Sequence, residues 1–415
     1  MQRSLRRMES ASAEEITRYQ ERRLRAMVKV AAARSPFYRD WFAGSGTNPS
    51  SIRTLDDLTA LPLLKREDLV ERPDRFRVYP RRLMWTAHSS GTSGSAVTVY
   101  RTPGSSVFEL SALERQWSWF GLPPRPRRIT LRAAGPDPSR DGAVSRVIAG
   151  SQQMLVSSYT LGTSTLNRLL AEMRAFEPQA IEGWPSSIAL LASLLRDRGE
   201  RLPVAGVITS SEVMTTQQIT LMEEVFCAPV IDHYGQTERV TMAGQCQAGG
   251  YHLFPDYAIT ELLPVEGRPG RWEIVGTPLH NWGFPMFRYR TGDEVGQGPQ
   301  HRCPCGRAFP LIGVIDGRVE DSFTSSTGHV LPLPATVVDD LLGLREAQIA
   351  QLAPGRFEVR MVPTPATDLE GLRTQVLRNV ERHFGTGQTV TFRVLERIPR
   401  SRSGKLKPAV VEDQD

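Results

Sequence analysis

The pattern of apolar and polar residues predicts an N-terminal helix followed by a long alternation of strands and helices. A capping box at Ser12–Glu15 opens a series of apolar residues at helical spacing, which stops before Ser35. Further along, the expected strands are 128–132, 180–182, 207–209 and 229–232, and the expected helices are 166–176, 186–195 and 215–226. Strands and helices in turn favour right-handed crossovers and a mostly parallel sheet.

The pattern changes after residue 258, where short strands without intervening helices predict a small β-subdomain. These strands are expected at 259–263, 272–275 and 286–289. The last hundred residues predict a compact α+β module with helices at 335–342 and 368–384 and strands at 348–351, 357–362 and 390–395. The predicted fold class is α/β. A large N-terminal domain, residues 1–317, has mostly parallel sheets and the β-subdomain, and a small mobile C-terminal α+β domain spans residues 318–415.

Composition narrows the class of protein. The chain has 415 residues, 40% of them hydrophobic, and a net charge of +6. No apolar run approaches the roughly 20 residues of a membrane span, and the basic N-terminus lacks the apolar stretch of a secretory signal. Basic residues are mixed with 45 acids and form no stripe with aromatics, so we expect no nucleic-acid partner. Four cysteines in a chain of this length indicate a reducing, cytoplasmic compartment.

A loop of small hydroxyl residues and glycines lies between expected strands at 83–87 and 97–100. Its residues are Ser89, Ser90, Gly91, Thr92, Ser93, Gly94 and Ser95. Such a loop presents backbone N–H groups and hydroxyls without side-chain bulk, which suits phosphate oxygens. It lacks the spacing and lysine of a P-loop, and a plain hairpin turn is the alternative.

Three other motifs give this loop a context. Tyr234-Gly235-Gln236-Thr237-Glu238 follows an expected strand, Tyr289-Arg290-Thr291-Gly292-Asp293 comes later, and Ser403-Gly404-Lys405 lies near the C-terminus. With Gly317–Asp321 they stand in the order found in the adenylate-forming (ANL) superfamily. The chain resembles its phenylacetate–CoA ligase-like branch most, because Ser35–Tyr38 and Leu61–Lys65 also resemble segments of that branch.

This resemblance implies an ATP-dependent and Mg²⁺-dependent enzyme that converts a carboxylic acid into an acyl adenylate. The glycine-rich loop would hold the β- and γ-phosphates, and Lys405, Thr237 and Glu238 would be catalytic, with Glu238 also a Mg²⁺ ligand. The implied nucleotide contacts beyond the loop are Ser211, Glu212, Asp232, His233, Tyr234, Gly235, Thr237, Asp293 and Arg318. Trp184 and Gly235 would line the acid pocket.

Each role has an ordinary structural alternative. Tyr234 and Trp184 could be core aromatics, Glu238 a solvated charge beside Arg239, Asp293 a turn residue and Arg318 part of a surface ion pair. The rarity of lysine supports the role of Lys405, because this arginine-rich chain has lysine only at Lys29, Lys65, Lys405 and Lys407.

The chain departs from the branch in the phosphate loop, at the hinge and in the loop that approaches the acceptor in the second half-reaction. Ser95 replaces a common lysine, Glu320 replaces the hinge aspartate, and Ser326–His329 replaces an Arg-Gly pair. The acyl acceptor therefore stays open among CoA, a carrier-protein thiol and an amine, and the acid is expected to be an aryl acid. A nucleotidyl transferase that stops at adenylation and a non-catalytic nucleotide-binding protein are the alternative functions. A homodimer is also left open.

A separate group of residues fits a metal. Cys303-Pro304-Cys305-Gly306 forms a tight turn that can direct two thiolates at one ion, and Cys246 and His252 would complete a tetrahedral structural Zn²⁺ site. His301 is an alternative fourth ligand, and reduced buried cysteines are the alternative to zinc.

Overall fold

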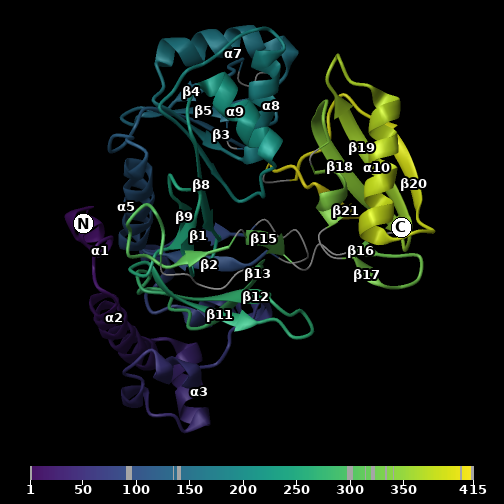
Figure 1. Ribbon diagram of the computed structural model, residues 1–415. Helices are drawn as coiled ribbons and strands as arrows, with labels where there is room; N and C mark the ends of the chain where they lie inside the picture. The colour runs from purple at the N-terminus through teal and green to yellow at the C-terminus, as the bar shows by residue number, and fades with distance from the viewer. Residues whose placement is uncertain are drawn as a thin grey trace. The chain divides into compact units, whose positions relative to one another are not determined.

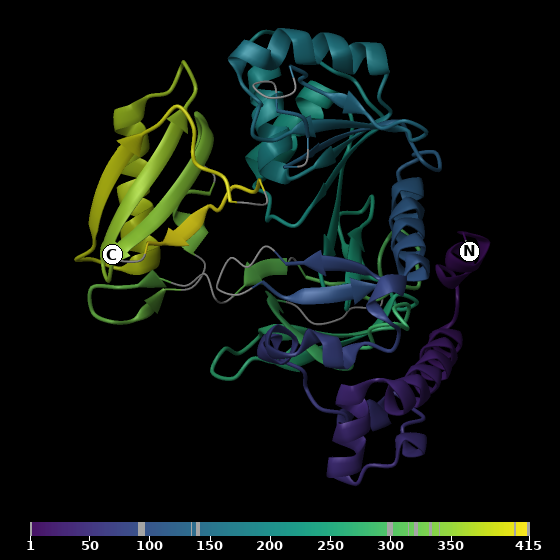
Figure 2. The same ribbon diagram turned by 180° about the vertical axis from the view of Figure 1, so that it is seen from behind.

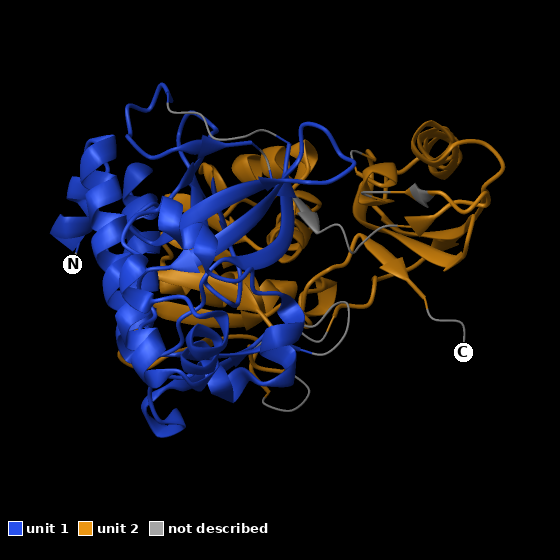
Figure 3. Ribbon diagram, turned by 90° about the horizontal axis from the view of Figure 1, so that it is seen from below, with its two compact units in different colours: residues 1–124, 231–316 blue, residues 125–230, 317–415 orange. Residues whose placement is uncertain are grey.

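The chain folds into two compact units, each built from two stretches of sequence. The computed structural model describes residues 2–89, 96–133, 135–137, 142–296, 302–313, 315–318, 323–331, 334–339, 341–401 and 404–412, with the backbone alone at 316–318 and 330. Unit 1 contains residues 1–124 and 231–316, and unit 2 contains residues 125–230 and 317–415 (Figure 3). The predicted division at residues 1–317 and 318–415 groups the segments differently and stays a prediction.

The helices of unit 1 come mostly from its first stretch. They are α1 (Gln2–Met8), α2 (Ala13–Arg34), α3 (Pro36–Ser45), α4 (Arg66–Glu71) and α5 (Pro103–Trp119), with four short 3₁₀ helices between α3 and β1. The predicted capping box is confirmed, because the Glu15 carboxylate accepts from the Ser12 N–H at 2.9 Å and the Ser12 hydroxyl accepts from the Glu15 N–H. Among the described residues no helix combines the length and apolar character needed to cross a bilayer.

The strands of unit 1 form antiparallel arrangements. A hairpin joins β1 (Trp85–His88) and β2 (Thr98–Arg101), and β8 (Val230–Gly235), β9 (Met242–Gln245), β10 (Tyr251–Leu253) and β14 (Leu311–Ile312) lie in the order β14-β10-β9-β8. The predicted β-subdomain is confirmed as the sheet β11-β12-β13-β15, with bounds Ala258–Pro264, Trp272–Pro278, Tyr289–Val295 and Ile315–Arg318.

The strand predicted at 286–289 is wrong except for its last residue. Met286 and Phe287 are fully buried but precede β13, and Arg288 has a positive φ of 52° that turns the chain there. The Phe287 N–H donates to the Tyr38 hydroxyl at 3.0 Å, so this apolar segment is held by a side chain rather than by a strand partner.

Unit 2 begins with the predicted alternation of strands and helices. The strands β3 (Arg128–Arg132), β4 (Arg146–Val147), β5 (Gln153–Ser157), β6 (Ala180–Gly183) and β7 (Gly206–Ser210) lie in the order β7-β6-β3-β5-β4. All neighbours pair in parallel except β4 with β5. The helices α7 (Thr163–Phe176), α8 (Pro185–Arg196) and α9 (Thr216–Phe226) gather around these strands (Figure 1).

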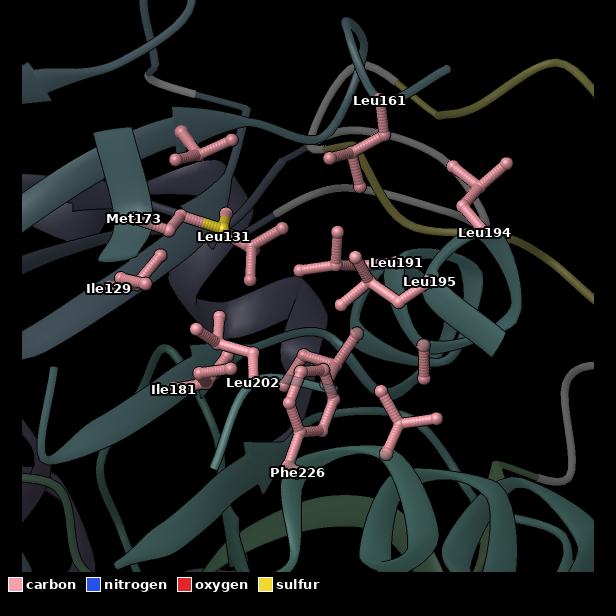
Figure 4. Close-up of a cluster of buried hydrophobic side chains, with 14 of the residues drawn as sticks. Ile129, Leu131, Leu161, Met173, Ile181, Leu191, Leu194, Leu195, Leu202 and Phe226 are labelled. Atoms are coloured by element: carbon pink, nitrogen blue, oxygen red, sulfur yellow. The ribbon is translucent and has the colours of Figure 1, made fainter. Parts of the chain in front are cut away.

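The core of this part of unit 2 consists of aliphatic side chains from the strands and these helices. Ile129 and Ile181 on the strands, Leu191 and Leu195 on α8, and Phe226 at the end of α9 are all fully buried (Figure 4). Burial of each such side chain is worth about 1.5–3 kcal/mol. The core therefore fixes the carboxyl ends of β3, β6 and β7.

The C-terminal part of unit 2 is the predicted α+β module. Strands β18 (Leu344–Ala353), β19 (Arg356–Pro363), β20 (Thr389–Val394) and β21 (Ala409–Val411) lie in the order β20-β19-β18-β21, and β16 (Phe323–Thr324) pairs with β17 (Val330–Leu331). Helix α10 (Leu369–Phe384) covers one face of the four-stranded sheet, and the view from behind shows the strands in front of it (Figures 1 and 2).

The helix predicted at 335–342 is wrong in length. Only a 3₁₀ turn, Pro334–Val337, forms among the residues described there. Thr336, Val337 and Val338 are β-branched, which lowers their preference for a helix.

A buried histidine in unit 1 gives a testable pH dependence. His280 is 4% exposed and packs against the rings of Phe108 and Tyr257, and burial lowers its pKa to about 3. The unfolded chain takes up this proton near the ordinary pKa of about 6.5, whereas the folded chain does not. Stability should therefore fall as the pH drops below about 6.5, by about 2 kcal/mol at a pH of about 5.

Urea unfolding of the wild type and of His280→Phe tests this, at a pH above the ordinary histidine pKa of about 6.5 and at a pH of about 5. The variant should lose much less stability, and the Tyr257 carbonyl keeps its hydrogen bond from the Leu279 N–H at 2.9 Å. His383→Gln, at an exposed position, is the control and should behave like the wild type. Equal losses in His280→Phe and the wild type would contradict the prediction.

Candidate active site

The carboxyl edge of three parallel strands in unit 2 places several predicted residues next to one another. Gly183 on β6 is in register with Leu131 on β3 and with Thr209 on β7. The residues that follow, Arg132, Trp184 and Ser210, therefore lie at the same edge of the sheet. In open parallel sheets, ligands bind at this edge.

The motif lysine reaches this edge from the C-terminal module. The Lys405 Nζ donates to the Ser211 carbonyl oxygen at 3.2 Å, across 194 positions of sequence, and lies 4.6 Å from the centroid of the Trp184 ring. Ser211 has a positive φ of 70°, which is uncommon for a residue with a side chain. Three residues predicted to belong to the site, from separate segments of the sequence, thus meet within unit 2.

Glu212 is fixed by the start of α8. Its carboxylate accepts hydrogen bonds from the Ser186 N–H at 2.8 Å and from the Ser186 hydroxyl at 3.2 Å. Burial raises the pKa of Glu212, although the Ser186 hydrogen bonds and the Lys405 charge act in the opposite direction. The carboxylate thereby ties the turn after β7 to the turn after β6.

The segment that carries Lys405 is a tight turn docked on the same edge. The Gly404 N–H donates to the Ser401 carbonyl at 2.8 Å, and the Tyr159 hydroxyl donates to that same carbonyl at 2.7 Å. Gly404 has a φ of 83°, and a Cβ placed there would lie 2.6 Å from the Ser158 hydroxyl oxygen. Residue 404 therefore has to be glycine for the lysine turn to sit this close to β5.

Gly404→Ala should slow acyl-adenylate formation while leaving the fold intact. The left-handed conformation costs a residue with a Cβ about 1–2 kcal/mol, and the Ser158 contact adds to this cost, so a loss of roughly 5- to 30-fold is expected. Gly199→Ala is the matched control, because Gly199 also belongs to unit 2 and has a φ of 67° and open space around it. ATP–pyrophosphate exchange measures the step, and equal exchange by both variants would argue against a docked lysine turn.

In unit 1 the end of β8 carries two predicted nucleotide contacts whose polar groups are already oriented. The Tyr234 hydroxyl donates to Asp293 Oδ2 at 2.6 Å, and the Tyr251 hydroxyl donates to Asp232 Oδ2 at 2.6 Å. Burial, followed by the Asp293 charge, raises the pKa of Tyr234 well above its ordinary value. Tyr234 and Asp293, predicted to contact adenine and ribose, thus lie side by side, and His233 and Gly235 pair with β9.

Thr237 and Glu238 lie just beyond β8 among buried charges. Glu238 is 3% exposed and accepts from the Tyr289 hydroxyl at 3.2 Å, so the alternative of a solvated charge is wrong. The Arg101 guanidinium donates to the Thr237 carbonyl, and burial together with the neighbouring Arg239 lowers the pKa of Arg101 to about 10. Two guanidinium groups therefore lie near this motif. Sequence reasoning named Arg239 only as a neighbour of Glu238 and missed Arg101, because nothing local distinguishes Arg101 in an arginine-rich chain.

Part of the predicted site lies outside the described residues. This holds for Ser90, Gly91, Thr92, Ser93 and Gly94 and for the side chain of Arg318, whose backbone ends β15. Ser89 is described and closes the β1–β2 hairpin, because its N–H donates to the Val97 carbonyl and its hydroxyl accepts from the Val97 N–H, both at 2.9 Å.

The four predicted zinc ligands come together in unit 1. The donor atoms of Cys246, His252, Cys303 and Cys305 all lie within 4.8 Å of one another. Cys246 Sγ is 3.6 Å from Cys303 Sγ, and Cys305 Sγ is 3.2 Å from His252 Nε2. Sulfur ligands of one tetrahedral zinc ion are about 3.8 Å apart, given Zn–S bonds of about 2.3 Å. The alternative ligand His301 lies outside the described residues.

The surroundings of these donors fit a metal. His252 Nδ1 lies 2.7 Å from the Phe309 carbonyl oxygen, so with a proton on Nδ1 the Nε2 lone pair faces Cys305. Burial lowers the pKa of His252, which favours the neutral imidazole that binds a metal. The pKa of Cys305 is lowered overall. Burial raises it, but hydrogen bonds from the Arg307 backbone and from Cys303 together have the larger, opposite effect.

Comparison with known proteins identifies the fold. No family model matches the chain. The solved structure of a 2-hydroxyisobutyryl-CoA ligase in the postadenylation state, with an acyl adenylate bound, superimposes with a TM-score of 0.76 over 98% of this chain and 91% of that chain, at 21% identity. An anthranilate CoA ligase with anthranoyl-AMP gives a TM-score of 0.53 over 79% and 67%, at 13% identity. The chain therefore has the fold of the adenylate-forming ligases.

Curated sequences point to one branch of that class. The chain is 25% identical to the phenylacetate-coenzyme A ligase of Thermus thermophilus, over 96% of this chain and 97% of that protein. It is 26% identical to the Pseudomonas putida enzyme of the same name over 78% and 75%, and 19% identical to protein CapK of Staphylococcus aureus over 94% and 88%. The chain is thus similar to phenylacetate-coenzyme A ligases along almost its whole length, as the sequence motifs indicated.

Proposed function

We propose that this protein is an ATP-dependent ligase that activates a small carboxylic acid as an acyl adenylate and transfers the acyl group to CoA. The observation that carries the proposal is the contact of Lys405 with the Ser211 carbonyl and the Trp184 ring. This contact brings the C-terminal lysine motif to the carboxyl edge of the parallel strands, where the Ser210–Glu212 turn also lies.

The first half-reaction joins two anions. A carboxylate oxygen of the acid forms a bond to the α-phosphorus of ATP, the bond from that phosphorus to the bridging oxygen breaks, and pyrophosphate leaves. Negative charge builds up on the α-phosphate, so the site has to supply positive charge aimed at it. The Lys405 ammonium is suited to this task, because it is compact and sits on a flexible stem.

Each unit has its own predicted nucleotide contacts. In unit 1, Thr237 would donate to the α-phosphate, the Tyr234 ring would contact adenine and Asp293 would accept from the ribose. The Glu238 carboxylate, oriented by Tyr289, is a suitable oxygen ligand for Mg²⁺, which would offset phosphate charge. In unit 2, Glu212 would hold the turn after β7 through its hydrogen bonds with Ser186.

In the second half-reaction the thiol of CoA attacks the acyl carbon, a C–S bond forms, the bond from that carbon to the phosphate oxygen breaks, and AMP leaves. The thiol proton passes to solvent. The names of the relatives support CoA as the acceptor, although the Ser326–His329 segment departs from the branch. A carrier-protein thiol and an amine are the other acceptors to be tested.

We also propose that Cys246, His252, Cys303 and Cys305 hold one zinc ion. All four positions are taken by protein donors, so the metal would be structural and would leave no coordination position for substrate. It would tie the turn at Cys303–Gly306 to strands β9 and β10.

ATP–pyrophosphate exchange over a panel of aryl, acyl and amino acids tests the function. We expect exchange with at least one acid, aryl acids being the first candidates, and a thioester when CoA is added to that acid and ATP. Exchange without transfer to CoA, an amine or a carrier thiol would favour the nucleotidyl transferase. Absence of exchange with every acid would favour the non-catalytic nucleotide-binding protein.

A further inference from the structure

Trp184 occupies a rigid position at the carboxyl end of β6. It precedes Pro185, the first residue of α8, and has the extended conformation with φ −70° and ψ 135° that residues before proline favour. On its strand side, a Cβ at Gly183 would lie 2.7 Å from the Leu131 carbonyl oxygen, so β6 and β3 are closely packed there. The indole ring is therefore carried on a backbone with little freedom.

Two cations contact this ring. The Arg132 guanidinium carbon lies 3.9 Å and the Lys405 Nζ 4.6 Å from the ring centroid. Both distances are within the range of a cation–π interaction, for which tryptophan is the strongest aromatic partner. These two cations distinguish Trp184 from a core tryptophan packed only against apolar side chains.

The charge of Arg132 is partly offset by Glu182, which also pairs with Arg128. Glu182 on β6 lies 3.4 Å from an Arg132 nitrogen and accepts from Arg128 Nε at 2.7 Å. Because Glu182 is the counterion of Arg132, the guanidinium opposes the approach of the Lys405 ammonium less than an unpaired charge would.

From this arrangement we infer that Trp184 is a positioning residue that holds the Lys405 ammonium at the carboxyl edge of the unit 2 strands for adenylation. The inference rests on the proposed catalytic role of Lys405. It goes beyond the predicted role of Trp184 in the acid pocket. The ring supplies a flat, negatively polarised surface, and the Ser211 carbonyl supplies a directional acceptor. Together they restrict a side chain that otherwise has four freely rotating bonds.

A labelling experiment tests the contact without the need for a substrate. The only lysines are Lys29, Lys65, Lys405 and Lys407, so acetylation by N-hydroxysulfosuccinimide acetate can be followed at each one by peptide mass spectrometry. In Trp184→Leu, Lys405 should be acetylated roughly 2- to 30-fold faster than in the wild type. This range is the ratio of rates that corresponds to the free energy of one cation–π contact. The other three lysines should keep their rates. Trp184→Phe should lie between the two, since phenylalanine retains an aromatic face.

Trp282→Leu is the matched control. Its indole also has a guanidinium over the ring, that of Arg23 at 4.7 Å, and it belongs to unit 1. Acetylation of Lys405 should be unchanged in this variant. Equal acetylation of Lys405 in Trp184→Leu and the wild type would overturn the inference, whatever the function of the protein.

The half-reactions separate this role from that of a pocket residue. With phenylacetate as the acid, Trp184→Leu should lower the exchange rate constant roughly 2- to 30-fold. It should leave the KM for phenylacetate and the transfer from synthetic phenylacetyl-AMP to CoA near those of the wild type. In the Lys405→Ala background the substitution should have no further effect, because the residue acts through the lysine.

A full additional loss in that background, or a raised KM for phenylacetate, would overturn the positioning role. If Lys405→Ala retains normal exchange, the catalytic assignment of Lys405 fails, and the inferred purpose of the contact fails with it. If Lys405→Ala loses exchange and Trp184→Leu does not, the positioning role alone fails.

Discussion

Replacing Lys405 with alanine should slow acyl-adenylate formation by about 10²–10³-fold, while transfer of the acyl group from a preformed adenylate should survive. The physical reason is that Lys405 would neutralise charge that exists only while the carboxylate attacks the α-phosphate. Removal of one such electrostatic contact from a transition state costs about 2.7–4 kcal/mol. In the second half-reaction the attacking group is a thiol and the phosphate is a leaving group, so this contact is not needed.

The chain offers controls for this prediction. Lys407→Ala removes the same charge two residues further on and should leave the exchange rate near that of the wild type. Lys405→Arg keeps the charge, but it replaces a compact ammonium with a planar, bulkier group and should rescue little activity. ATP–pyrophosphate exchange measures the first step, and transfer from synthetic acyl-AMP to CoA measures the second. Near-normal exchange by Lys405→Ala would contradict the assignment and weaken the enzyme proposal itself.

Several strands and helices of unit 2 were predictable because their signals are local. Strand β3 has the predicted bounds, Arg128–Arg132, and β6, β7 and α7–α9 differ from the predictions by a few residues at most. Each element is an apolar run or a helical stripe bounded by turn residues, so tertiary packing reinforces what the local pattern indicates. The α2 capping box is local in the same sense.

Helix α5 was missed, although Thr102 caps it and Pro103 occupies its first turn. The helix buries residues on several sides, including Gln116 and the fully buried Arg115, so no clean apolar stripe marks it. Arg115 pairs with Asp256, 141 positions away, and no local sequence pattern predicts a partner at that distance.

The residues of the candidate site also differ in whether a local sequence signal marks them. Residues that come directly after a strand, such as Glu212, could be placed from the sequence because the topology of a parallel sheet gathers them at one edge. Side chains that shape the site from elsewhere could not. Arg101 reaches the Thr237 carbonyl across 136 positions, and Arg132 was considered only as the end of a strand.

The zinc proposal predicts the largest effect on stability. Purified protein should contain about one zinc ion per chain, because four donors of the types zinc prefers meet at one point. Cys305→Ser should lose the metal, while Cys227→Ser, at the exposed free cysteine outside the cluster, should keep it. Elemental analysis of the three proteins gives the stoichiometry. Less than about a tenth of an equivalent in the wild type would contradict the site.

Loss of the metal should also destabilise unit 1. Structural zinc binding is worth about 10–16 kcal/mol in small peptides, and even a modest part of this energy spent on folding should lower the melting temperature by at least about 5 °C. A chelator such as EDTA should reproduce the effect of Cys305→Ser in the wild type and have little further effect on the variant. Because the ligands lie on β10, at the end of β9 and before β14, the change should be seen first as faster amide exchange in these strands. A wild type that keeps its melting temperature after complete removal of zinc would show that the cluster is packed well enough without a metal.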